Sequence, residues 1–141
     1  YFMPHINCYA YAVGANKSLC PGARKTGDSS IFDWHKVKAI TTERKRELLQ
    51  ACMKDGLSDM PLTGRKIAVF INQYSDCIDY HFYKLDEGST WSDKLGDQGE
   101  VRHGNDCRLM NLALVGRPDA RGDRIVDQTF GGYLYVPQNL K

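Results

Sequence analysis

The sequence of this chain lacks the signals of several common functional classes. No apolar run approaches the roughly twenty residues of a membrane-spanning helix, so we expect no membrane insertion. A net charge of +2 is too small to indicate a nucleic-acid partner, and no glycine-rich phosphate loop is present. The chain has no Cys-x-x-Cys pair and its four histidines are scattered, so we expect no metal site and no cofactor.

The cysteine content does not indicate a disulfide scaffold either. Five cysteines are too few for a disulfide scaffold in 141 residues, and their odd number leaves at least one thiol free or paired with another chain. The chain begins at Tyr1 without an initiator methionine and carries no signal peptide, so we expect an excised domain or a mature product. A hydrophobic content of 42% with 26% charged residues is typical of a soluble globular protein, and the length fits one domain over residues 1–141.

The first stretch with chemical character is residues 7–14, NCYAYAVG. Asn7 can cap a short helix that ends at a glycine, which places Cys8 at the positive end of the helix dipole. A thiolate is favoured there, so Cys8 is a candidate nucleophile. The alternative is that Cys8 is a small buried hydrophobic residue, as most free cysteines are.

The next part of the chain is expected to be a loop followed by helices. Residues 14–30 are rich in glycine, proline and serine, which indicates a long surface loop that is either functional or a passive insertion. The apolar residues of 31–40 have a weakly helical spacing. Residues 42–55 form the strongest helical pattern, with a threonine cap before it and a glycine after it. Its apolar stripe predicts that Cys52 and Met53 lie in the core.

The second half of the chain changes to strand patterns. We expect strands at residues 67–71, 79–85, 89–94, 124–126 and 132–136. Residues 86–88 are expected to form a three-residue hairpin loop that ends at a left-handed glycine. Residues 95–123 are polar and glycine-rich, with one apolar patch at 109–115. Helices followed by a mostly antiparallel sheet make an α+β fold.

The expected hairpin brings an imidazole and a carboxylate together. With a loop at 86–88, Tyr83 faces Trp91 and His81 faces Asp93, on one face of the sheet. A carboxylate beside an imidazole selects its tautomer and stabilises its charged form. Such a histidine could take a proton from Cys8, which would complete an activated nucleophile. The alternative is a polar hairpin face on which His81 and Asp93 merely pair.

Several motifs occur together and in one order, and they carry a resemblance. They are NCYAYA at 7–12, CPG at 20–22, DYHFY at 79–83, GSTWSDKLG at 88–96, IVD at 125–127 and FGGY at 130–133. Over most of its length the chain resembles bacterial secreted cysteine hydrolases that are often toxin or effector modules. It is also distantly similar to papain-like enzymes of the NlpC/P60 kind and to deamidases such as TecA.

The resemblance implies a papain-like fold, with N-terminal helices packed on a mostly antiparallel sheet. It implies Cys8 as the nucleophile and His81 as the general base. NlpC/P60-like enzymes take their third residue from the strand after the histidine, which points to Asp93, although related sequences often have histidine there. TecA-like deamidases take an aspartate much further along, which points to Asp127, and we favour Asp127 with Asp93 as its rival. The backbone N–H of Cys8 is an expected oxyanion donor, with Asn7 as a candidate supporting group whose simpler role is the helix cap.

The expected activity is hydrolysis of an amide bond, as a peptidase or an amidase, in a secreted toxin or effector that acts in the cytoplasm or periplasm of a target cell. Expected partners are a protein or peptide substrate and a cognate inhibitor or immunity protein. One alternative is a deamidase of glutamine or asparagine in a host protein. A second is a non-catalytic binding module in which Cys8 is bridged to Cys20 or another thiol.

Overall fold

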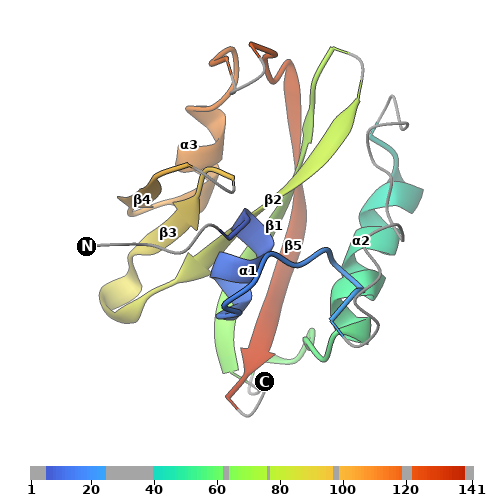
Figure 1. Ribbon diagram of the computed structural model, residues 1–141, viewed down its shortest axis with the longest axis vertical. Coiled ribbons are helices and arrows are strands. Elements are labelled where there is room, and N and C mark those ends of the chain that lie inside the picture. Colours follow the sequence, from blue (N-terminus) through green and yellow to red (C-terminus); the bar gives the residue numbers. More distant parts are fainter. Residues whose placement is uncertain are drawn as a thin grey trace.

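A computed structural model of the chain describes residues 6–24, 40–61, 64–75, 77–96, 99–118 and 122–138. Within these residues the fold is α+β, with a five-stranded antiparallel sheet and three α-helices (Figure 1). The helices are α1 (Cys8–Val13), α2 (Thr42–Lys54) and α3 (Cys107–Leu112). The strands are β1 (Gly64–Gln73), β2 (Ile78–Leu85), β3 (Trp91–Lys94), β4 (Val101–Gly104) and β5 (Asp127–Pro137).

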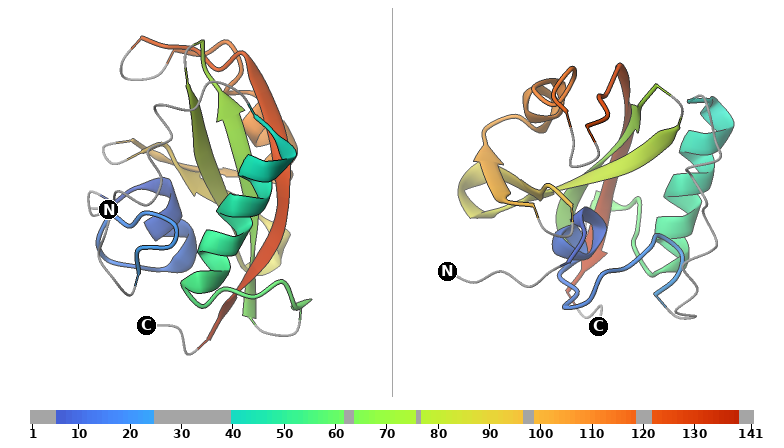
Figure 2. Two further views of the ribbon diagram at one scale, coloured as in Figure 1. Left: turned by 90° about the vertical axis from the view of Figure 1, so that its right-hand side faces the viewer. Right: turned by 45° about the horizontal axis from the view of Figure 1, so that its top comes forward.

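The sheet has the order β4-β3-β2-β1-β5, and all neighbouring strands are antiparallel. The strand β1 lies between β2 and β5 and is buried on both faces over most of its length, as its continuous apolar run predicted. The helices α1 and α2 pack on one face of the sheet, and α3 packs on the other, which Figure 2 shows most clearly in its left view.

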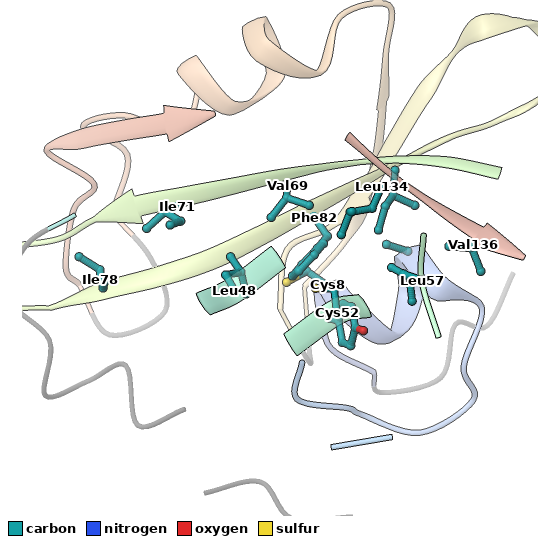
Figure 3. Packing of buried hydrophobic residues seen from close by; sticks show 13 residues of the cluster. Cys8, Leu48, Cys52, Leu57, Val69, Ile71, Ile78, Phe82, Leu134 and Val136 are labelled. Carbon is teal, nitrogen blue, oxygen red and sulfur yellow. The ribbon is translucent and has the colours of Figure 1, made fainter. Parts of the chain in front are cut away.

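The larger core lies between the sheet and the pair α1 and α2. It joins alternate side chains of β1 and β2 to residues of both helices, among them Cys8, Leu48, Cys52 and Phe82, which Figure 3 shows at close range. The side chains between them point to the opposite face, where Phe70, Tyr83 and Trp91 pack with Cys107 of α3. Successive residues of a strand face opposite sides of the sheet, so each strand supplies both clusters.

The helix α2 confirms its prediction closely. The side chain of Thr41 accepts a hydrogen bond from the Arg44 N–H and caps the helix, and Asp55 and Gly56 end it. Cys52 is fully buried, as expected, but Met53 is 38% exposed, so its core assignment is wrong. Met53 follows directly after Cys52 and therefore lies about 100° round the helix, beyond the edge of the buried stripe.

Two parts of residues 95–123 form regular secondary structure, although a polar loop was expected there. The strand β4 and the helix α3 both lie there, and Asp106 caps α3 by accepting from the N–H groups of Arg108 and Leu109. Residues 124–126, expected as a strand, form only isolated bridges beside Val115 and Pro118. Most of residues 25–40, including nearly all of the weakly helical stretch, lies outside the described residues.

Candidate active site

Cys8 is the first residue of α1, where the sequence predicted it. Asn7 is the N-cap, and its Oδ1 accepts hydrogen bonds from the N–H groups of Ala10 at 3.0 Å and Leu19 at 3.3 Å. Its Nδ2 donates to the Leu19 carbonyl at 2.8 Å, and its backbone N–H donates to Ser18 Oγ at 3.1 Å. Asn7 therefore acts as a cap that also ties the following loop to α1, which is the simpler of its two expected roles.

The sulfur of Cys8 lies against the backbone of β2. Its Sγ is 3.9 Å from the carbonyl oxygen of Tyr80, and the backbone N–H of Phe82 also interacts with it. In the described chain, β3 pairs with β2 at Lys84 and Leu85, which leaves the preceding edge of β2 to α1. The sulfur is thus placed beside the main chain on both sides of His81.

The surroundings of Cys8 favour the neutral thiol. The residue is 7% exposed, and burial raises the pKa of its thiol far above the ordinary value. The carboxylates of Asp79 and Asp93 raise this pKa further, while the N–H groups of Phe82 and Tyr9 oppose the shift. In this conformation Cys8 is therefore protonated at neutral pH, and ionisation requires a proton acceptor close to the sulfur.

His81 and Asp93 are in direct contact. His81 Nε2 lies 2.6 Å from Asp93 Oδ2, and both residues are buried, at 8% and 0% exposure. The predicted pairing is present, but the register that predicted it is wrong by two residues. Leu85 pairs with Trp91 and Lys84 with Ser92, so the connection spans residues 86–90 and includes a 3-10 turn at Glu87–Ser89.

The two-residue error leaves His81 and Asp93 on one face because the side-chain period of a strand is also two. Asp93 is then diagonal to His81 rather than directly opposite, and the two side chains still meet. Tyr83, whose ring centroid is 4.9 Å from that of His81, packs edge-on against the imidazole. The hairpin therefore fixes the position of the His81 ring.

Arg102 of β4 also contacts the Asp93 carboxylate. Its Nη2 is 2.6 Å from Asp93 Oδ2 and its Nε is 3.1 Å from Oδ1, which is a two-point contact. Burial alone would raise the pKa of the Asp93 carboxyl, but the hydrogen bonds from His81 and Arg102 outweigh it and hold that pKa below the usual value. Asp93 is therefore a carboxylate at neutral pH although it is fully buried.

A chain of buried polar groups continues from Arg102 beneath α3. Arg102 Nη2 lies 3.3 Å from the Tyr83 hydroxyl, which donates to Asn111 Oδ1 at 3.1 Å. Asn111 Nδ2 donates to Asn72 Oδ1 at 2.8 Å and also contacts Gln128. No sequence pattern marked Arg102, Asn111 or this network, because the residues involved are scattered over four strands and α3.

Asp127, the favoured third residue, is not at this site. It is the exposed first residue of β5, and its Oδ1 accepts from the N–H of the next residue, Gln128. β5 is separated from β2 by β1, and Asp127 pairs with Gln73 rather than near Phe70, the partner of His81. The carboxylate that contacts His81 is therefore that of its rival, Asp93.

Cys8 and His81 approach β2 from different sides. The imidazole stands on the α3 face with Tyr83, whereas Cys8 packs with Phe82 on the face covered by α1 and α2. The hydrogen bonds within the described residues include none between Cys8 Sγ and the His81 ring. The structure thus brings His81 and Asp93 together and sets the sulfur beside the His81 backbone.

The other candidate groups do not extend this site. His103 is exposed on β4, as expected, while His5 and His35 lie outside the described residues. Cys8, Cys20, Cys52 and Cys107 are free thiols, so the bridge between Cys8 and Cys20 is not formed. No cluster of three or more histidine, cysteine or acidic residues in the described parts of the chain could hold a metal ion.

None of the described helices combines the length and the apolar character that crossing a membrane requires. Comparisons with protein-family models, with curated proteins and with solved structures found no match to this chain.

Proposed function

We propose that the chain is a papain-like, thiol-dependent hydrolase that acts on an amide bond as a peptidase or an amidase. Cys8 is the nucleophile, His81 is the general base, and Asp93 is the positioning residue that orients His81. The observation that carries this proposal is the buried pair of His81 Nε2 and Asp93 Oδ2 at 2.6 Å, with the Cys8 sulfur beside the backbone of the same histidine.

The pair of His81 and Asp93 defines which ring nitrogen reacts. An ionised carboxylate can only accept a hydrogen bond, so Nε2 of a neutral His81 carries the proton and Nδ1 keeps its lone pair. In the proposed reaction the sulfur leaves the Tyr80 carbonyl, and its proton passes to Nδ1. Because the sulfur and the imidazole lie on different faces of β2, this step requires the sulfur to pass the edge of β2 that precedes its pairing with β3.

The remaining steps follow from the chemistry of a thiolate. The sulfur adds to the carbonyl carbon of the amide, and the backbone N–H of Cys8 is available to the oxyanion. The C–N bond then breaks, and the leaving nitrogen takes the proton from His81. Water, deprotonated by His81, hydrolyses the thioester and restores the thiol. Because burial keeps Cys8 neutral at rest, the thiolate forms only when the sulfur reaches His81 Nδ1, and the proposal requires the free chain to visit that conformation.

The finer parts of the proposal rest on the resemblance of the motifs alone. They are secretion as a toxin or effector, action in the cytoplasm or periplasm of a target cell, a protein or peptide substrate, and a cognate inhibitor or immunity protein. The same acyl transfer on a glutamine or asparagine side chain would release ammonia and make the chain a deamidase. Intact-mass measurement separates the two activities, because deamidation adds about one dalton to the target without cutting it.

The test is the reaction of the folded chain with iodoacetamide, followed by peptide mass spectrometry. We expect Cys8 to be alkylated at neutral pH faster than Cys52, and the rate to fall about a hundredfold in His81→Ala, which lacks the proton acceptor. His103→Ala is the matched control, since His103 is an exposed histidine of the same sheet. A Cys8 thiol as inert as Cys52, or a rate that His81→Ala leaves unchanged, would overturn the proposal.

A further inference from the structure

We infer that Arg102 is a positioning residue for the proposed hydrolase: it is the permanent counter-ion of Asp93, and it sets both the tautomer and the charge of His81. This inference rests on the proposed function for its catalytic meaning. The coupling of Arg102 to the His81 imidazole does not depend on that function, because both groups contact one carboxylate, that of Asp93.

His81 and Arg102 share one oxygen atom of the Asp93 carboxylate. His81 Nε2 and Arg102 Nη2 are both 2.6 Å from Asp93 Oδ2, and Arg102 Nε adds a contact of 3.1 Å to Oδ1. Asp93 is fully buried, so its negative charge needs a partner that is always positive. A neutral imidazole cannot fill that role, whereas a guanidinium is charged at every relevant pH.

Arg102 is itself held in place by two further contacts. The Tyr83 hydroxyl lies 3.3 Å from Nη2, and the Met110 carbonyl of α3 lies 3.4 Å from Nη1. The guanidinium side chain is 16% exposed, so solvent has limited access to it. Three neighbouring elements, β2, β3 and α3, thus hold the guanidinium in one plane, which fixes the Asp93 carboxylate that the imidazole contacts.

The charge around His81 is set by the titratable groups that neighbour it. The neighbouring titratable groups are Asp93 on β3, Arg102 on β4, Tyr83 and Asp79 on β2, Cys8 on α1, and Cys107 on α3 beside Tyr83. Burial keeps the thiols and Tyr83 neutral at pH 7. Arg102 therefore offsets the Asp93 charge beside the imidazole, while the carboxylate remains the group that orients the ring.

The same arrangement explains why Arg102 matters for the reaction. An imidazolium held by a bare buried carboxylate could not take the Cys8 proton, because it has no lone pair. With Arg102 fixing the Asp93 carboxylate, a neutral His81 carries its proton on Nε2 and presents Nδ1 as the base. Loss of Arg102 should therefore change the pH at which the His81 ring gains its second proton. A merely structural role would leave that pH unchanged.

The experiment is NMR titration of the His81 ring in the full chain, with Arg102→Met compared with wild type. We expect wild type to show the neutral Nε2–H tautomer, and Arg102→Met to move the titration midpoint upward by at least about one pH unit, as loss of a close charge does. Arg102→Lys retains the charge and should bring the midpoint back towards wild type. Arg117→Met is the control, because Arg117 is exposed and its nearest carboxylate oxygen, on Glu100, is 3.9 Å away.

Should Arg102→Met not fold, Arg102→Gln serves as the second variant. Its amide can donate one hydrogen bond to Asp93 but carries no charge, so the same upward shift is expected. An unchanged midpoint and tautomer in a folded Arg102→Met or Arg102→Gln chain would overturn the inference. The titration needs no turnover, so an inert Cys8 refutes the proposed function while the result for Arg102 is read separately.

Discussion

At the scale of single residues, Asp93 and Asp127 differ only in their surroundings. Both are aspartates in strands, and both fit a triad when judged by their order in the chain. Asp93 is completely buried between an imidazole and a guanidinium, whereas Asp127 is exposed and bonded to its own backbone. Burial with two donors gives Asp93 a fixed orientation, which an orienting group in a triad requires.

We predict that Asp93→Asn destabilises the fold and slows the reaction of Cys8, while Asp127→Asn does neither. The first change leaves the Arg102 guanidinium without a counter-ion in a mostly buried site, which costs about 3 kcal/mol. The second alters an exposed group and should stay within about 0.5 kcal/mol. Urea unfolding measures the stabilities, and iodoacetamide the reactivity of Cys8; equal effects of the two changes would contradict the assignment.

At the scale of elements, a buried carboxylate joins α1, α2 and the loop between them. Asp55, the C-cap of α2, is 1% exposed and accepts from the Tyr9 hydroxyl at 2.7 Å and the Gly22 N–H at 2.8 Å through Oδ2. Its Oδ1 accepts from the Arg24 N–H at 2.9 Å. The turn at residues 20–22 therefore serves to close the fold around α1, and through α1 it holds Cys8 in place.

We predict that Asp55→Asn lowers the free energy of unfolding by about 1–3 kcal/mol, since an amide nitrogen must replace one of the two accepting oxygens. It should also speed proteolytic cleavage of residues 14–24. Glu47→Gln is the control, because Glu47 is a surface carboxylate of the same helix, paired with Arg44. A loss of stability in Glu47→Gln equal to that in Asp55→Asn would contradict a specific role for Asp55.

At the scale of the whole molecule, the ionisable groups in the core set the pH range of stability. Burial raises the pKa of Cys8, Cys52 and Tyr83 well above ordinary values, and raises the pKa of Cys107 to about 11. Unfolded cysteine and tyrosine ionise near pH 8.5 and 10, respectively. The stabilisation from keeping these groups neutral is complete below about pH 8 and is lost as the pH rises towards the folded pKa values.

Asp93 has the opposite effect on the pH dependence of stability. Its folded pKa is depressed, so its contribution is complete above the unfolded value near 4 and is lost as the pH falls through the folded pKa. The chain should therefore be most stable between about pH 5 and 8, with a loss on the acid side from Asp93 and a larger loss on the alkaline side, where several groups titrate.

We predict that Cys52→Ala flattens the alkaline loss. Above about pH 9 the unfolded wild-type chain releases a proton from Cys52 that the folded chain keeps, which is worth about 1.4 kcal/mol per pH unit. Removal of the thiol should lower the slope by that amount, although the variant is less stable overall. Urea unfolding at a series of pH values measures the slope, and identical slopes for wild type and Cys52→Ala would refute the prediction.

The parts of the fold that could be predicted are those with local causes. The cap at Asn7, the helix after Thr41 and the apolar run of β1 follow from neighbouring residues, and all three are confirmed. The helix α3 was missed because its exposed face carries Leu109 and Leu112, so its apolar pattern does not mark a buried stripe. The strand β4 is short and mostly polar, and it is defined by its pairing with β3.

In the candidate site, too, the features with local causes could be predicted and those made by tertiary contacts could not. Local sequence patterns were enough to predict that His81 and Asp93 share a face of the hairpin, because strand alternation survives a register error of two residues. They were also enough to predict that Cys8 begins a capped helix. The tertiary contacts placed Asp93 rather than Asp127 against His81, brought Arg102 to the carboxylate, and set the sulfur beside the backbone of His81. Those contacts join segments far apart in the chain, and their cause is the order of strands in the sheet and the packing of α1, which no local pattern encodes.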